Sequence, residues 1–183
     1  MRIYTKTGDT GQTSLYGGRR VDKDTTQIQV VGEIDELNAC LGLARSTNDN
    51  LQINEVLQRI QHELFSLGAE LGTPSDLHRK LDFQMAQQQV SQLEIDINTL
   101  ESKLPPIRQF ILPGGTFSSS MLHLARTVCR RCERRVVTLS KDQPVSPEIF
   151  QYLNRLSDLL FVLARSANAV IGVADVFWTQ PLP

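Results

Sequence analysis

Residues 146–171 read SPEIFQYLNRLSDLLFVLARSANAVI, and they have the pattern of one long amphipathic helix. Apolar residues recur here at alternating spacings of four and three, which place them on one face of an α-helix. These residues are Ile149, Leu153, Leu156, Leu160, Leu163 and Ala167. Ser146 suits the N-cap and Pro147 suits the first helical position, so we expect the helix to begin there. An apolar stripe of this length has to be buried against other helices.

Four further segments have the same periodicity, and they cover about 26–46, 51–71, 82–103 and 117–140. Turn-forming residues interrupt the pattern between them, at Pro74, Pro105, Pro106, Gly114 and Gly115. Long helices joined by short connections predict an all-α bundle of five helices over residues 26–171, in a single domain. Residues 1–25 hold four glycines and have no helical period, so we expect them to form an ordered N-terminal arm.

The chain of 183 residues suits one domain with a sizeable core, and its 40% hydrophobic and 21% charged residues are ordinary for a globular protein. Its formal net charge of -1 argues against a nucleic-acid-binding protein, which usually has a broad basic surface. No apolar run approaches the roughly 18–20 residues of a membrane-spanning helix. The N-terminal stretch MRIYTKTGDTG lacks the apolar region of a signal peptide, so we expect a cytoplasmic protein that contacts neither membrane nor nucleic acid.

Residues 126–135 read RTVCRRCERR, and five of these ten residues are arginines with one acid among them. On a helix Arg126, Arg130 and Arg134 follow at spacing four, where each like-charged pair destabilises the helix by about 0.2–0.5 kcal/mol. Together with Glu133 they project within roughly 100° of one another, away from the apolar side. Arginine forks bind phosphate oxygens in bidentate fashion, so this concentration of charge favours a compact anion. The alternative is a solvated basic face with pairs within the helix.

The stretch TKTGDTGQTS at residues 5–14 combines glycines with a lysine and several hydroxyl groups. Glycine lets backbone N–H groups approach phosphate oxygens, and Lys6 adds a positive charge. Hydroxyl donors come from Thr5, Thr7, Thr13 and Ser14. The stretch is not a Walker A motif, because the lysine precedes the first glycine and Gln12 stands where that motif has lysine. By its chemistry alone it is either a phosphate-binding loop or a solvated glycine-rich turn.

Three cysteines, Cys40, Cys129 and Cys132, do not make a disulfide framework. Cys129 and Cys132 form a C-x-x-C motif, but no second pair of cysteine or histidine ligands stands at zinc-binding spacing. Both sulfurs fall on the apolar side of the helix expected at 117–140. We therefore expect core packing rather than metal or redox chemistry, since a free cysteine often behaves as a small buried hydrophobe.

Two pairs of polar residues lie one helical turn apart, Asp35 with Asn38 and Asn154 with Asp158. Asp35 belongs either to an ordinary polar face or to a site, where a buried acid would pair with an arginine. Asn154 lies within an otherwise apolar stripe, and its position alone indicates an ordinary polar residue on a face of the bundle.

Five blocks of the chain resemble, in order, the propanediol-utilisation-type ATP:cob(I)alamin adenosyltransferases. They are YTKTGDTGQTSLYGG, VGEIDELNACLG, FILPGG, ARTVCRRCERRVV and YLNRLSDLLFVLAR. The resemblance implies a ferritin-like five-helix bundle that assembles as a homotrimer, with active sites between subunits. ATP would be held by the N-terminal arm and the arginine helix, with Mg²⁺. The 5′-deoxyadenosyl group of ATP would pass to the cobalt of reduced cobalamin, releasing triphosphate.

The resemblance also implies roles for individual residues. ATP contacts are implied for Thr5, Lys6, Thr7, Gly8, Thr13, Ser14, Lys23, Arg130, Arg131, Glu133, Arg134 and Asn154. Arg126 would pair across the subunit boundary with Asp35, and Phe110 would close one face of the corrin site. The sequence identifies no ligands for Mg²⁺.

A second function of another class is an ATP-binding trimer that acts as a sensor or cobalamin carrier without turnover. Such a protein would keep the arginine helix but would need neither Phe110 nor the stretch FILPGG, so their presence favours the enzyme. The enzyme would also make transient contacts with a cob(II)alamin reductase and with an adenosylcobalamin-dependent enzyme.

Overall fold

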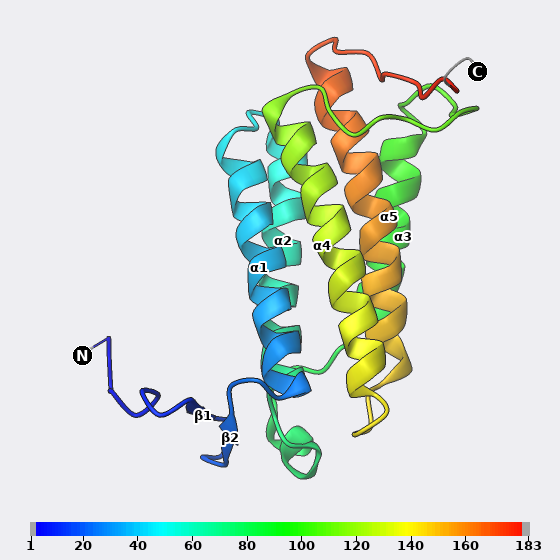
Figure 1. The fold of residues 1–183 in the computed structure, drawn as a ribbon. Coiled ribbons are helices and arrows are strands. Elements are labelled where there is room, and N and C mark those ends of the chain that lie inside the picture. The colour runs from blue at the N-terminus through cyan, green and yellow to red at the C-terminus, as the bar shows by residue number, and fades with distance from the viewer. Residues whose placement is uncertain (1–2, 181–183) are drawn as a thin grey trace.

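The computed structural model describes residues 3–180, and within that range it contains five α-helices (Figure 1). They are α1 (Thr26–Ser46), α2 (Leu51–Leu71), α3 (Gln87–Glu101), α4 (Phe117–Leu139) and α5 (Pro147–Val170). A 3-10 helix at Ser75–Lys80 follows α2, and the arm contains two short strands, β1 (Gln12–Ser14) and β2 (Arg20–Asp22). The prediction of an all-α bundle of five helices is therefore confirmed.

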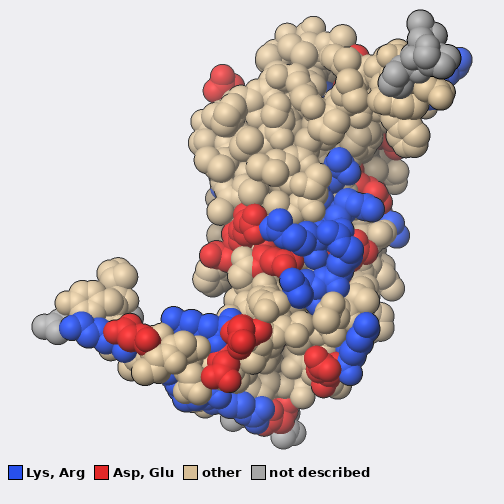
Figure 2. Space-filling view, in the orientation of Figure 1, with Lys and Arg blue, Asp and Glu red and all other residues tan. Residues whose placement is uncertain are grey.

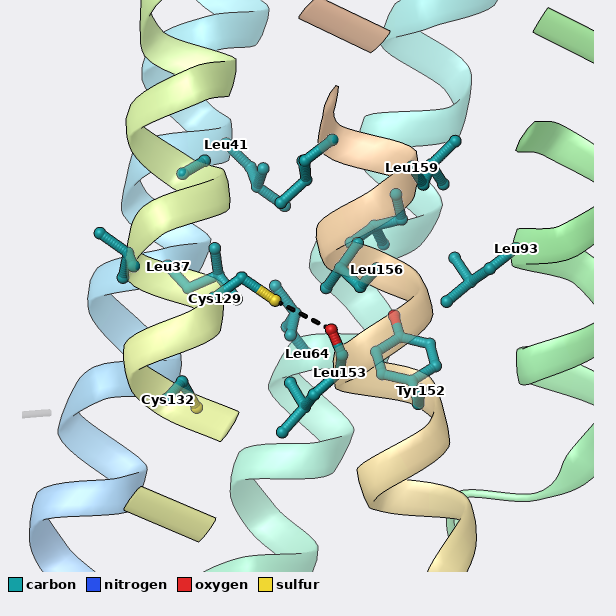
Figure 3. Packing of buried hydrophobic residues seen from close by; sticks show 14 of the residues in the cluster. Leu37, Leu41, Leu64, Leu93, Cys129, Cys132, Tyr152, Leu153, Leu156 and Leu159 are labelled. Carbon is teal, nitrogen blue, oxygen red and sulfur yellow. Dashed lines mark hydrogen bonds between the residues drawn. The ribbon is translucent and has the colours of Figure 1, made fainter. Parts of the chain in front are cut away.

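The core lies between helices whose apolar stripes face one another. α4 packs between α1 and α5, while α2 lies against α1 and α3 lies against α5 (Figure 1). Figure 3 shows leucines of α1, α2, α3 and α5 meeting in the interior. The stripe expected on α5 is buried as predicted, with Leu153, Leu156, Leu160 and Leu163 fully inaccessible to solvent. Burying side chains of this size contributes about 1.5–3 kcal/mol each, so the stripe is what holds α5 in the bundle.

The helix expected over residues 82–103 begins later, because α3 starts at Gln87. Two side chains bind the backbone N–H groups that precede it. The carboxylate of Glu70 accepts from Met85 N–H at 2.7 Å, and the side chain of Gln89 accepts from Ala86 N–H at 3.2 Å. The predicted start at residue 82 was wrong because a tertiary contact to a buried glutamate holds this segment extended.

The N-terminal arm contains a two-stranded hairpin that the sequence pattern did not indicate. β1 and β2 pair antiparallel, with Thr13 opposite Val21. The turn between them needs Gly17 and Gly18, whose φ angles of 84° and 87° are unfavourable for residues with a side chain. Leu15 is buried, but most of the arm is exposed, and it projects from the start of α1 away from the bundle (Figure 1).

The C-terminal tail (residues 171–180) returns across the end of the bundle to the α3–α4 loop (residues 102–116) (Figure 1). Asn168, in the last turn of α5, fixes the far end of that loop. Its Oδ1 accepts from Thr116 N–H at 2.9 Å and its Nδ2 donates to Gly114 O at 3.1 Å. A Cβ on Gly115 would lie 2.3 Å from Asn168 Oδ1, so the GG of FILPGG lets the loop approach α5 this closely.

Candidate active site

The arginines of α4 divide into two groups that face different helices. Arg131 pairs with Glu36 of α1, and Arg135 Nε lies 3.3 Å from Glu33 Oε1 on the same helix. The counter-charge from Glu36 raises the pKa of Arg131 through a hydrogen bond. Residues 126–135 contain one acid, and α1 supplies two more as partners for these arginines, Glu33 and Glu36. Arg131 was expected to contact ATP, but within the protomer its guanidinium is engaged with α1.

Arg126 and Arg130 line a different surface, a groove of about 320 Å³ between α4, α5 and α3, which we call the arginine groove. Two acids, Glu101 of α3 and Asp158 of α5, also line this groove, but among residues 3–180 no carboxylate lies within ion-pair distance of either guanidinium. Arg126 is half-buried, and its Nε is buried without a hydrogen-bond partner in the described chain. Burial lowers the pKa of Arg126, and the positive charge of Arg130 lowers it further. A partly desolvated cation without a partner is costly, so an anion or a carboxylate from outside the described chain would stabilise Arg126 in this groove.

Glu133, Arg134 and Asn154 lie beside the arginine groove. Asn154 Nδ2 on α5 is 3.5 Å from Glu133 Oε1 on α4, so the two residues predicted to contact ATP meet across the helix boundary. Arg134 Nη1 donates to the backbone oxygen of Arg130 at 3.0 Å and leaves the rest of its guanidinium exposed. Figure 2 shows lysine and arginine side chains gathered over α4, with acidic side chains beside them over α1.

The arm brings together most of its predicted phosphate contacts. Thr5 Oγ1 and Thr7 Oγ1 lie 2.8 Å apart, and Lys6 between them has a φ of 60°. Among the described residues Lys6 is the one non-glycine residue with positive φ. Such a backbone costs roughly 1–2 kcal/mol and tends to persist at functional sites. Lys23 Nζ would be 3.2 Å from a Cβ on Gly8, so the missing side chain leaves room for this ammonium group.

Arg20 is a cation of the arm that the sequence interpretation missed. Its Nη2 donates to Thr7 O at 2.7 Å and its Nη1 donates to Ser14 Oγ at 3.3 Å. It thereby joins the two predicted ends of the phosphate loop. The signal was present in the pairing of β1 with β2, which sets Arg20 opposite Ser14, but these three-residue strands are too short to recognise from periodicity.

The arm and the arginine groove do not meet within one protomer. In the described part of the chain no hydrogen bond or ion pair joins residues 3–25 to α4. Asp35 is likewise exposed and is not paired with Arg126. It lies on another wall of the bundle, where it lines a cavity of about 580 Å³ with Thr13 and Ser14 of the arm and with Phe65 of α2.

Phe110 stands at the opposite end of the molecule from the arm, on the α3–α4 loop. Its side chain is 82% exposed although it is large and apolar. It lines a cavity of about 650 Å³ together with Ile107 of the same loop and Trp178 of the C-terminal tail. The sequence interpretation did not foresee that the tail contributes to this cavity.

The two cysteines of the C-x-x-C motif are buried in the core, as predicted. Cys129 Sγ donates to Leu153 O at 3.3 Å (Figure 3). Burial raises the pKa of the Cys132 thiol to about 12 and raises that of Cys129 well above its ordinary value. Thiols of this kind are neutral and unreactive at physiological pH.

The described residues contain neither a metal-binding cluster nor a membrane-spanning helix. Among residues 3–180 no three histidine, cysteine, aspartate or glutamate side chains are grouped so that they could hold a metal ion. Within the same range no helix is both long and apolar enough to cross a membrane.

Comparison with known proteins shows that most of this chain matches one family. The family model for cobalamin adenosyltransferase matches residues 3–167. A corrinoid adenosyltransferase of Bacillus subtilis (strain 168) is 43% identical over 180 residues, covering 96% of this chain and 91% of that protein. The corrinoid adenosyltransferase PduO of Citrobacter freundii is 42% identical over 92% of this chain, which spans 50% of that longer protein.

Solved structures give the same result. A variant PduO-type ATP:corrinoid adenosyltransferase from Lactobacillus reuteri, complexed with cobalamin and ATP, superposes with a TM-score of 0.91 at 36% identity. The match covers 98% of this chain and 100% of that one. A second variant from the same organism, complexed with ATP, has a TM-score of 0.90 at 36% identity over 97% of this chain and 100% of that one.

Proposed function

This chain belongs to the cobalamin adenosyltransferase family, and from that premise we propose that it transfers the 5′-deoxyadenosyl group of ATP to the cobalt of a reduced corrinoid. The observation that carries the proposal is the arginine groove, where the half-buried Arg126 and the exposed Arg130 lie together with no carboxylate of the described chain within ion-pair distance. A triphosphate is the compact anion that such a groove suits, and triphosphate is the leaving group of this reaction.

The reaction requires the protein to align the two substrates and to stabilise the charge of the leaving group, and it requires no covalent intermediate with the protein. Co(I) supplies an electron pair to the ribose C5′, the cobalt–carbon bond forms, and the C5′–oxygen bond breaks. The electrons of the broken bond leave on the triphosphate, whose negative charge therefore grows in the transition state. Preorganised guanidinium groups stabilise that developing charge, and bound substrates held in line avoid the entropic cost of meeting in solution.

We infer that each site is shared between copies of the chain, in the homotrimer that the resemblance implies. The inference is supported by two residues that form no ion pair within residues 3–180, the half-buried Arg126 and the exposed Asp35. A carboxylate from a second copy would satisfy the desolvated guanidinium. It would also bring the arm of that copy, with Thr13 and Ser14 near Asp35, toward the arginine groove.

Mg²⁺ fits this site as a companion of the nucleotide. Proteins usually hold this ion through one or two carboxylates together with substrate phosphates, rather than through a cage of side chains. Glu133 is the carboxylate that lies one turn from Arg130 and would be its ligand from the protein. When bound, the ion would neutralise part of the triphosphate charge.

The cavity beside Phe110 would receive the corrinoid. The apolar ring of Phe110 is exposed within this cavity, where it would keep water and a lower axial base from the cobalt. A cytoplasmic location and contacts with a reductase and with an adenosylcobalamin-dependent enzyme stay predictions.

The test is anaerobic incubation of the purified protein with ATP, Mg²⁺ and chemically reduced cobalamin, followed optically for the cobalt–carbon product. We expect adenosylcobalamin and triphosphate in equal amounts. ATP binding without any cobalt–carbon product would instead identify a sensor or carrier.

A further inference from the structure

The C-terminal tail forms backbone hydrogen bonds to the segment that carries Phe110. Trp178 N–H donates to Phe110 O at 2.7 Å, and Leu112 N–H donates to Val176 O at 2.8 Å. Between these bonds Ile111 and Phe177 form an antiparallel bridge. The backbone of Phe110 is therefore fixed on one side by the tail, like a residue in a two-stranded ribbon.

A buried ion pair anchors both partners of this ribbon to α5. Arg165 Nε donates to Asp175 Oδ2 at 2.8 Å, and Arg165 Nη2 donates to Pro105 O at 2.8 Å. The side chains are 3% and 12% exposed, so this pair is far more shielded than an ordinary surface salt bridge. One guanidinium thus binds the start of the tail and the start of the Phe110 segment.

Trp178 and Phe110 line the same cavity of about 650 Å³, one from each strand of the ribbon. Both rings are exposed, at 47% and 82%, although neither gains stability from facing water. Their separation depends on the register of the ribbon, and the register depends on where Arg165 holds Asp175 and Pro105.

We propose that Arg165 and Asp175 are positioning residues for the cobalt-binding cavity: their ion pair holds the tail so that Phe110 and Trp178 face the corrinoid. This inference rests on the proposed function. Neither residue touches the substrate, and both act through the backbone of the tail and the α3–α4 loop.

The test compares Asp175→Asn with Asp96→Asn. Asp96 pairs with Arg59 between α3 and α2, and it is 14% exposed, so it is a matched control far from the tail. Both variants lose one charge from an arginine pair, and both are expected to melt at a lower temperature. The control is the milder change, because Arg59 is 30% exposed and keeps Glu63 as a second partner. Only Asp175→Asn is expected to slow adenosylation from Co(II) with a weak reductant, by about tenfold, with the KM for ATP unchanged.

A double-mutant cycle shows whether the pair acts through Phe110. If it does, Asp175→Asn adds less than about twofold in a Phe110→Ala background, because coupled residues are not additive. Fully additive losses, or equal losses in Asp175→Asn and Asp96→Asn, would overturn the proposal and leave the ion pair a contribution to stability alone.

Trp178 gives a readout that needs no turnover, because it is the one tryptophan among the 183 residues. Quenching of its fluorescence by acrylamide is expected to rise in Asp175→Asn and to stay unchanged in Asp96→Asn. Unchanged quenching in Asp175→Asn would refute the claim that the ion pair fixes the position of the tail, whatever the adenosylation activity of the variant. If Asp175→Asn and Asp96→Asn differ in quenching but the wild-type protein makes no adenosylcobalamin, the proposed function is refuted and the positioning of the tail is not.

Discussion

Arg126 lies one helical turn before Arg130, and the two guanidinium groups line the same groove without a carboxylate partner in the described chain. Burial and the charge of Arg130 both lower the pKa of Arg126, so the ionised form of Arg126 is less favourable here than in water. Arg131 and Arg135, on the same helix, avoid this cost by pairing with α1. One helix therefore carries a compensated pair and an uncompensated pair. We propose that Arg130 of the uncompensated pair binds ATP and that Arg126 meets Asp35 of a second copy.

The proposed nucleotide site has one cation in the arginine groove, Arg130, and one in the arm, Lys6. Loss of either cation should weaken ATP binding or turnover. Arg130→Ala and Lys6→Ala are each expected to raise the KM for ATP or lower kcat/KM by roughly ten- to a hundredfold, since each removes a charge-assisted phosphate contact. Arg135→Ala is the control, because its guanidinium pairs with Glu33. Circular dichroism should show unchanged helix content in all three. Near wild-type kinetics in both test variants would remove the phosphate site from these positions.

The pairing of Asp35 with Arg126 should hold copies of the chain together. Asp35→Ala and Arg126→Ala are each expected to shift sedimentation from a trimer toward smaller species and to lower activity in parallel. Glu36→Gln, one residue along α1, removes a carboxylate that already pairs with Arg131 and should leave assembly intact. A monomer with full activity in the sedimentation cell would contradict a site shared between subunits.

The buried thiols should matter for stability and not for turnover. Because burial raises the pKa of Cys132 to about 12 and that of Cys129 well above its usual value, the folded chain keeps both protonated. The unfolded chain loses these protons near pH 9, so the free energy of unfolding should fall as pH rises from about 9 toward 12. The slope is up to about 1.4 kcal/mol per pH unit for each thiol.

Cys129→Ser with Cys132→Ala should flatten that slope, although Tyr152, whose pKa burial also raises, will still contribute. Turnover should stay within a few-fold of wild type at neutral pH, while urea denaturation shows reduced stability because core atoms are lost. Stoichiometric zinc in the wild type that is absent from this variant would show that the motif binds metal.

Phe110 should govern the cobalt step rather than ATP binding. Phe110→Ala is expected to leave the KM for ATP unchanged, because the cavity that Phe110 lines includes none of the residues proposed to contact ATP. Water or a lower base would then reach the cobalt. Adenosylation from Co(II) with a weak reductant should therefore fall far more than adenosylation from preformed Co(I). An equal fall in both assays with a lowered melting temperature would point to a packing role.

Helical periodicity predicted the parts of the fold that depend on local pattern. Residues 51–71 were expected as one helix, and α2 has those bounds, because its apolar stripe runs unbroken from an asparagine N-cap to Gly72. The start of α3 was missed because Glu70 binds Met85 N–H, a contact between residues that no short window contains.

The site was predictable only where a run of residues of one chemical type is visible in the sequence. The arginines of residues 126–135 were visible, but their division into two groups depends on Glu33 and Glu36 of another helix. The roles of Asp175 and Trp178 were not visible, since the ribbon that joins Ile111 to Phe177 forms between distant segments with no strand pattern of their own.

The claim that one copy supplies the arm and another the arginine groove is tested most directly by co-expressing Lys6→Ala and Arg130→Ala under two affinity tags. Each variant alone should be nearly inactive. Mixed trimers purified through both tags contain one site in which the intact arm of one copy meets the intact groove of another, so about one third of wild-type adenosylation activity should return. Mixed trimers that recover no activity would contradict the shared site.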